Sequence, residues 1–408
     1  MIKNINKMRS LKLFILIIFL FCGLTLWAQD FGIVIDQSVD FNAHGLEWDD
    51  IRIDYSGAII PYASFFLGDF GEINLIAGFT YRIDPWFYVP ELLVAELVLY
   101  LGRSEFRVGR MTYSDPLGII ANGFLDGALF SLDTKAGIFS LGGWYTGYLY
   151  KNRAAITMTE DEENHFYSKF DIFNFMDTYF APKRVLASLA WESPSIGGVV
   201  DLQLAVHGQY DLTEAGLNTY YASAKITTSV KNMVFDIGGC YQVIDYMDEF
   251  TMAAAASMGF NWRLISGKDQ FFSLRGIYST GVFENYPVTA FLPVTTVSQG
   301  NLLKAKLSGI SIVSMNFLSY LNRYLAAEFD FSYFVRSDLG TYKHYPVIGV
   351  DSEGFLLGPE VFCRFLLNNF SGFQMNIGGG AFLPFMGNAA SDANILWRAE
   401  LNVLFSLF

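Results

Sequence analysis

The sequence predicts an all-β fold, a transmembrane antiparallel up-and-down β-barrel of about eighteen strands, with sixteen as the alternative count. After residue 28 the chain contains about eighteen runs of about ten residues, and many alternate polar and apolar side chains. Short and long links alternate between these runs, and no stretch beyond the N-terminal region is apolar enough for a membrane-spanning helix. Outer-membrane barrels combine these features, because short turns join their strands on the periplasmic side and longer loops on the outer side.

The links show this alternation directly. Tight links include residues 68–72 (GDFGE) and 102–105 (GRSE), whereas residues 151–182, 282–302 and 337–354 form much longer ones. When short and long links alternate, every strand reverses direction and all the long loops lie at one end. With both termini on the periplasmic side, the number of strands must be even.

Residues 201–211 show the side-chain alternation most clearly. Side chains along a strand point to opposite faces with a period of two, so one face can meet water and the other lipid. A soluble β-sandwich also alternates, but its strands average about five to six residues, so strand length favours the barrel. The polar face of this run holds Asp201, Gln203, Ala205, His207, Gln209 and Asp211, and the other holds Leu202, Leu204, Val206, Gly208 and Tyr210.

The N-terminal region predicts export. Residues 1–12 contain four basic side chains, and residues 13–24 are apolar but too short to span a bilayer. We therefore expect residues 1–28 to be a signal peptide cleaved after Ala28, and residues 29–408 to form a single barrel domain. A retained membrane anchor, or a lipoprotein attached through Cys22, is the alternative.

Charge and composition exclude several classes of function. Removing four positive and no negative charges with residues 1–28 changes the net charge from −13 to −17. A chain this acidic is a poor nucleic-acid binder, because phosphate must be neutralised by basic surface. Cys240 and Cys363 are predicted to be unpaired and buried, and no spacing of residues indicates a metal or another cofactor.

The last run, residues 395–408, alternates up to an aromatic C-terminus, Phe408. Here the chain resembles bacterial outer-membrane barrels of the porin-like type, whose final strand ends in an aromatic residue that the assembly machinery reads. In that family the terminal aromatic usually continues the apolar face, whereas Phe408 has the opposite parity. The resemblance implies a location in the lipid bilayer of the outer membrane and recognition of Phe408 by the barrel-assembly machinery. It leaves open whether the protein is a monomer or a trimer.

The same parity predicts which charged side chains line the lumen. Their mixed signs suit hydrated solutes, and the interior is expected to be near neutral or slightly basic. The predicted pore-lining residues are Arg107, Arg184, Asp201, His207, Lys225, Arg263, Arg275, Glu328, Asp330, Arg336, Arg364 and Arg398.

The third outer link is the predicted constriction loop. In general porins, which this arrangement resembles, the third outer loop folds inward and narrows the channel, and we expect Tyr113, Asp115 and Asn122 to act there. The pair Arg110 and Asp126 resembles a stretch of porins for anionic sugars. The simpler interpretation is a turn with Arg110 at the rim.

The longest link carries two unusual segments. Residues 160–163 are four consecutive acids, which are most simply a solvated loop tip and alternatively a site for cations or a partner. Residues 170–180 are rich in aromatics, which we expect to pack over the barrel mouth or, alternatively, to enter the lumen.

No combination of residues predicts catalysis. Of the four histidines, His44, His165 and His344 fall in predicted outer loops, and no nucleophile is tied to any of them. The sequence therefore favours a channel for passive diffusion of small hydrophilic solutes, not an enzyme. A transporter for hydrophobic ligands of the fatty-acid type, or a surface adhesin, is the alternative.

Overall fold

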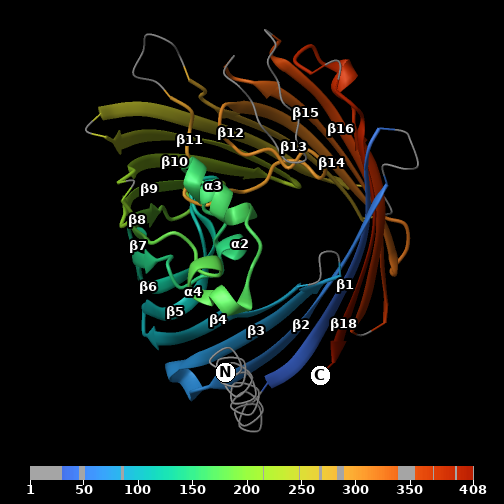
Figure 1. Ribbon diagram of the computed structural model, residues 1–408. Coiled ribbons are helices and arrows are strands. Elements are labelled where there is room, and N and C mark those ends of the chain that lie inside the picture. The colour runs from blue at the N-terminus through green and yellow to red at the C-terminus, as the bar shows by residue number, and fades with distance from the viewer. Residues whose placement is uncertain are drawn as a thin grey trace.

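The computed structural model describes residues 30–45, 51–83, 87–214, 216–247, 249–265, 269–282, 289–338, 354–370, 372–390 and 393–407. The predicted signal peptide, His344 and Phe408 lie outside these residues. Within them the chain forms eighteen strands arranged as one closed ring (Figure 1). The strand count of eighteen is confirmed over sixteen, because β14 ends at Tyr320 and a tight turn separates it from β15 at Leu325.

The bounds of the elements follow the alternating runs. The strands are β1 Asp30–His44, β2 Arg52–Phe66, β3 Gly71–Arg82, β4 Phe87–Leu101, β5 Ser104–Ser114, β6 Asn122–Thr134, β7 Gly137–Tyr145, β8 Arg184–Glu192, β9 Val200–Asp211, β10 Asn218–Val230, β11 Met233–Tyr246, β12 Glu249–Ile265, β13 Asp269–Ser279, β14 Ile310–Tyr320, β15 Leu325–Arg336, β16 Leu356–Phe370, β17 Phe373–Phe382 and β18 Leu396–Leu407. Short helices occupy the links, namely η2 Gly68–Phe70, α2 Lys151–Ala154, α3 Glu160–Tyr167, η3 Ile172–Asn174, α4 Phe175–Thr178 and η4 Pro384–Met386.

The ring closes where the last strand meets the first. β18 pairs with β1 in antiparallel register from Ile33 opposite Leu407 to His44 opposite Leu396. Every other strand pairs with its neighbours in sequence, also antiparallel. Closure leaves no edge strand, which is the condition for strands to cross hydrocarbon, where no water can satisfy a free backbone N–H or C=O.

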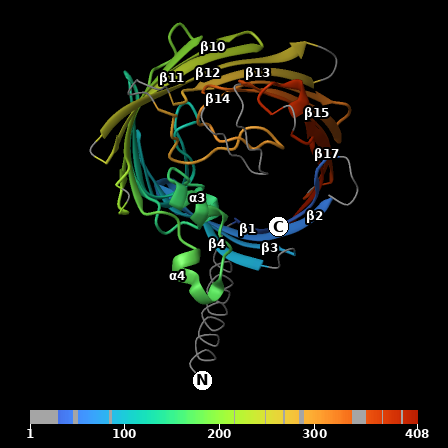
Figure 2. The same cartoon turned by 45° about the horizontal axis from the view of Figure 1, so that its top comes forward.

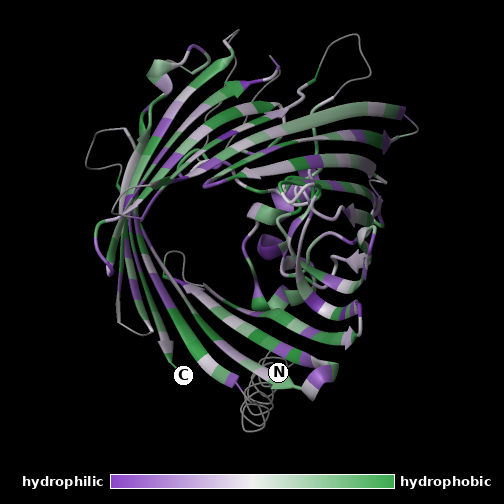
Figure 3. Cartoon of the chain, turned by 180° about the vertical axis from the view of Figure 1, so that it is seen from behind, coloured by the Kyte–Doolittle hydropathy of each residue, from purple (hydrophilic) through white to green (hydrophobic). Residues whose placement is uncertain are grey.

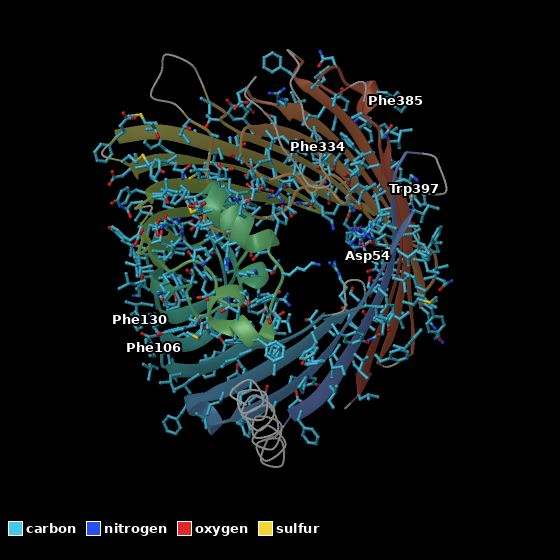
Figure 4. The ribbon with its side chains drawn as sticks, viewed as in Figure 1. Asp54, Phe106, Phe130, Phe334, Phe385 and Trp397 are labelled. Atoms are coloured by element: carbon cyan, nitrogen blue, oxygen red, sulfur yellow. The ribbon has the colours of Figure 1, made fainter. Side chains whose placement is uncertain are left out.

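Side chains alternate between the two surfaces of the wall, as Figure 3 shows by the banding along the strands. Outward-facing Leu141 and Met258 are 60% and 61% exposed, although both are apolar. Inward-facing Gln209 and Gln242 are fully buried although both are polar. Figure 4 likewise places Phe106 and Phe130 outside the wall and Asp54 on its inner side. Such an inverted distribution suits a wall with lipid outside and polar groups inside.

The links confirm the predicted asymmetry between the ends of the barrel. The links after even-numbered strands are tight, and the long links, including residues 146–183 and 280–309, all follow odd-numbered strands. The described ends of the chain, Asp30 and Leu407, lie at the short-turn end. We call the opposite end the long-link end.

Helices contribute little to the structure. No helix among the described residues is long and apolar enough to cross a membrane. In Figures 1 and 2, α3 lies inside the outline of the strands. Both described cysteines are free, as predicted, and Cys240 is buried. The prediction that Cys363 is buried was wrong, because its side chain is exposed on the outward face of β16.

Exchanging Ile377 for arginine tests the orientation of the wall. Ile377 points outward from the middle of β17, so Ile377→Arg in a bilayer should lower the free energy of unfolding by roughly 2–4 kcal/mol. Asn376→Arg is the matched control, because its side chain points inward and should cost much less. Urea titration of the barrel refolded in lipid measures both. Equal costs for the two variants would contradict the assignment of the faces.

Candidate functional site: the barrel interior

Three links at the long-link end fold into the barrel and share one apolar core. They are the β5–β6, β7–β8 and β13–β14 links. The core that they form with the inner wall has fully buried members from each link, among them Ile120, Ile156 and Leu303. Burying apolar side chains against one another holds the links inside the barrel instead of leaving them in solvent.

Asp115 organises the β5–β6 link. Its carboxylate accepts four backbone N–H groups, from Leu117 (2.9 Å), Gly118 (3.1 Å), Ile120 (2.8 Å) and Ala121 (3.1 Å). Gly118 has φ +68°, a conformation that glycine adopts without strain. Both oxygens of the buried carboxylate therefore hold the backbone of the link, and the carboxylate does not face a solute.

The two residues that flank this link fix its position. The Tyr113 hydroxyl lies 2.7 Å from His207 Nε2, and the Tyr113 ring packs on Trp144 with centroids 4.2 Å apart. The Asn122 backbone exchanges two hydrogen bonds with the Thr295 hydroxyl, at 2.7 and 3.0 Å. The β5–β6 link is therefore bound to the β13–β14 link, a contact between distant segments that sequence patterns could not show. That this link narrows a channel stays a prediction.

A buried ion pair anchors α3 to the wall. Arg184 of β8 donates to Glu162 Oε1 from Nε (2.9 Å) and Nη2 (2.7 Å), and Nη2 also meets Asp211 at 3.2 Å. Glu162 caps α3 as well, through a capping box with Thr159. The interpretation of residues 160–163 as a solvated tip was therefore wrong for Glu162. The pairing depends on the tertiary fold and leaves no local signal.

Aromatic side chains of the same link pack against the end of β4. Tyr150, Phe175 and Tyr179 surround Val89, and the Tyr179 hydroxyl donates to the Pro90 carbonyl at 2.8 Å. Burial, aided by the nearby Glu91, raises the pKa of Tyr150 to about 12. Burial also lowers the pKa of the Lys151 ammonium, which donates to Ser168. These aromatics pack at the long-link end of the wall.

Glu360 holds the tip of the β13–β14 link. Its carboxylate, on the inner face of β16, accepts the backbone N–H groups of Asn301 (2.5 Å), Leu302 (2.9 Å) and Leu303 (2.9 Å). Gly300 has φ +82°, and a Cβ there would lie 2.7 Å from Phe334. The link is joined to α3 as well, because Lys306 Nζ lies 2.7 Å from Glu163.

The wall from β15 through β18 to β1 carries a network of ion pairs. Arg364 Nε donates to Glu400 at 2.9 Å, and Nη1 lies 3.1 Å from Asp330 and 3.5 Å from Glu328. Arg398 Nη2 lies 2.7 Å from Asp40. Both arginines also reach Asn301, through its side-chain oxygen (2.5 Å) and its carbonyl (3.4 Å). These charged side chains stay partly exposed to the interior.

The register places all the predicted pore-lining residues on the inward faces of their strands, but in different surroundings. Arg184, His207 and Arg336 are buried. Arg263 lies at the short-turn end in an exposed ion pair with Asp269. The role of all twelve predicted residues in lining a passage stays a prediction. The remainder, Arg107, Asp201, Lys225, Arg275, Glu328, Asp330, Arg364 and Arg398, are at least partly exposed.

Arg110 and Asp126 face away from the interior. They are opposite each other in the register of β5 and β6, and adjacent Met111 is the inward residue. Arg110 pairs with both Asp126 oxygens (2.6 and 2.7 Å) and donates to the carbonyls of Leu92 and Tyr148. The pair therefore ties the β7–β8 link to the barrel rim. Within the described residues, no group of acidic, histidine or cysteine side chains could hold a metal.

Solved structures share this architecture. Pseudomonas aeruginosa OccK2 (OpdF), in complex with glucuronate, aligns with a TM-score of 0.62 at 10% identity, over 93% of this chain and 99% of that one. OccK5 (OpdH) and the outer membrane protein OpdK from the same organism give TM-scores of 0.60 and 0.59 at 11% and 10% identity, each over 93% of this chain and 99% of theirs. This chain has their barrel fold. No protein-family model and no curated protein matches the sequence.

Removing the charge of Glu360 should loosen the β13–β14 link. Glu360→Gln keeps the side-chain shape but replaces one acceptor oxygen by a donor that faces backbone N–H groups. We expect noisier current and a larger mean single-channel conductance in planar bilayers. Glu192→Gln, an acidic strand residue at the short-turn end of β8, is the control. Unchanged noise in Glu360→Gln would contradict the anchoring role.

Proposed function

We propose that the protein is a bacterial outer-membrane channel for passive diffusion of small hydrophilic solutes. The observation that carries this proposal is a closed eighteen-strand wall whose inner face bears partly exposed charges on β15–β18 and β1. Barrels of about this size enclose a lumen that wall side chains alone do not fill. A charged wall favours hydrated solutes over fatty acids, and the proposal includes no enzymatic role.

The inward links give the channel its shape. They pack together, and the core that they share lies against the inner wall toward the long-link end, with members on strands from β6 to β18. Solutes then pass beside the ion-paired wall of β15–β18 and β1. The cross-section is limited by the β13–β14 link, because Asn301 reaches both Arg364 and Arg398.

The fold of the relatives supports the location. OpdK is described as an outer membrane protein, and OccK2 was crystallised with glucuronate, a small sugar acid. For this chain we propose export through a cleaved signal peptide at residues 1–28, folding of residues 29–408 as one domain, and recognition of Phe408 during assembly. Both a monomer and a trimer are compatible with this function.

Single-channel recording tests the proposal. The purified, folded chain in planar bilayers should conduct ions in discrete steps, and liposomes that contain it should swell in solutions of small sugars. A folded barrel that shows no conductance at any voltage and no swelling would contradict a channel function. Binding of fatty acids without conductance would favour the hydrophobic-ligand alternative.

Lys304 should give the current an alkaline pH dependence. Enclosure within the barrel lowers the pKa of its ammonium, neighbouring Arg398 and Arg82 lower it further, and Asp40 and Glu400 partly oppose them. Lys304 therefore loses its proton below the usual lysine pKa of about 10.4. Loss of this positive charge should increase cation permeability at alkaline pH, and the increase should begin at a lower pH than the titration of an ordinary lysine would allow. Lys304→Met should remove that change, and an identical pH profile in both proteins would contradict this assignment.

A further inference from the structure

One row of directly opposed residues crosses six neighbouring strands of the inner wall. Each residue faces the next across a strand pair, so all of them lie side by side on one surface. We call this set the charged row. It consists of Glu328 on β15, Arg364 on β16, Gly378 on β17, Glu400 on β18, Asp40 on β1 and Asp54 on β2.

The charged row extends between the two ends of the barrel. Glu328 lies three residues after the start of β15, beside a tight turn at the short-turn end. Asp54 lies two residues after the start of β2, at the long-link end. Strands in a barrel are tilted by about 35–45°, so a row across them rises along the axis. A solute that follows the wall from end to end passes the row.

The glycine of the row lets its arginine pair across a strand. Gly378 has no side chain, and a Cβ at this position would lie 2.9 Å from Arg364 Cγ and 2.8 Å from the Phe362 ring. Arg364 can therefore extend over β17 and donate to Glu400 on β18 at 2.9 Å.

The guanidinium groups of this wall are already occupied. Arg364 is bound by Glu400, Asp330, Glu328 and Asn301, and Arg398 by Asp40, Glu400 and Asn301. An anion that enters the passage would have to displace the protein's own carboxylates from these arginines. Neither arginine therefore acts as a free anion site.

Carboxylates exceed cations on this stretch of wall. Asp40 stands directly between Glu400 and Asp54, and like charges directly opposite each other repel. Asp36, bound by Asn402 at 2.5 Å, adds another negative charge nearby. Arg52 offsets Asp54 only weakly, because its side chain is 55% exposed at the rim. On β15–β18, β1 and β2 the inward cations are outnumbered by inward carboxylates. The carboxylates are Asp30, Asp36, Asp40, Asp54, Glu328, Asp330, Glu360 and Glu400, and the cations are Arg52, Arg336, Arg364 and Arg398. Adding Arg82 of β3 and Lys304 of the β13–β14 link does not reverse this balance.

The opposite wall does not reverse this balance. Lys225 and Arg275 point inward from β10 and β13, and Asp201 and Asp236 point inward from β9 and β11. These two cations and two carboxylates balance one another. The other inward arginines of this wall are paired with carboxylates, Arg107 with Glu96, Arg263 with Asp269, and Arg184 with Glu162 and Asp211. The net charge that a solute meets in the passage is therefore set by the charged row.

We propose that the charged row makes the passage prefer cations, and solutes that carry a positive group such as amines and zwitterions, over free anions. This inference rests on the proposed channel function and specifies its substrate class. A mobile cation offsets the carboxylates that the arginines of this wall do not balance, whereas an anion beside the row must displace a carboxylate from Arg364 or Arg398. Walls of low dielectric strengthen such a preference, because they focus the field of their charges.

The zero-current potential in a KCl gradient tests the proposal on the full chain. The wild-type channel should pass K⁺ in preference to Cl⁻. Asp54→Asn, at the accessible end of the charged row, should lower the K⁺/Cl⁻ permeability ratio, and the double variant Asp54→Asn with Glu328→Gln should lower it by at least about twofold. Asp69→Asn removes an acid from the exposed tight turn between β2 and β3 and should leave the ratio unchanged.

The outcomes separate the two proposals. A wild-type channel that prefers Cl⁻, or variants whose ratio matches that of Asp69→Asn, overturns the inference and leaves the channel function intact. A folded wild-type barrel without any conductance overturns the channel function itself. The wild-type measurement needs no substitution, so it can contradict the inference even if a variant folds poorly.

Discussion

The structure depends on one constraint, namely that every backbone amide in the wall must find its partner on a neighbouring strand. The pairing of β18 with β1 completes this condition by removing the last open edges. Once the ring is closed, the period of two along each strand assigns every side chain to the interior or the exterior. Outward leucines, methionines and phenylalanines, and inward glutamines, arginines and carboxylates, follow from that assignment.

A wide closed ring leaves an interior that its own wall cannot fill, and the long links divide it. Toward the long-link end the links build a small protein-like core against the wall, with Asp115 and Glu360 satisfying backbone N–H groups and the Arg184–Glu162 pair fixing α3. Breaking a buried ion pair by removing one partner is strongly destabilising, so this packing fixes the positions of the links. The ion-paired stretch of β15–β18 and β1 stays polar and partly exposed, and we propose that its charge pattern sets which solutes pass.

The sequence predicted the features that depend on local periodicity. The number of strands, the alternation of short and long links, and the inward direction of Glu328 and Asp330 all follow from a period of two. The sequence could not show contacts between links, because these join positions far apart in the chain. Glu162 looked like one member of an acidic loop tip until Arg184 placed it in the core, and Asn301 carries no local signal of its contact with two arginines. The expectation of a near-neutral or slightly basic interior took no account of Asp40 and Asp54, because only the register places them beside Glu400.

Thiol labelling along one strand tests the central claim most directly. Single cysteines at each position from Ala327 to Phe331, in a chain whose own cysteines are replaced by alanine, can be exposed in lipid vesicles to a small water-soluble thiol reagent. We expect labelling with a period of two, rapid at positions 328 and 330 and slow at 327, 329 and 331, because alternate residues meet water and hydrocarbon. Equal labelling of both sets, or the opposite pattern, would contradict it.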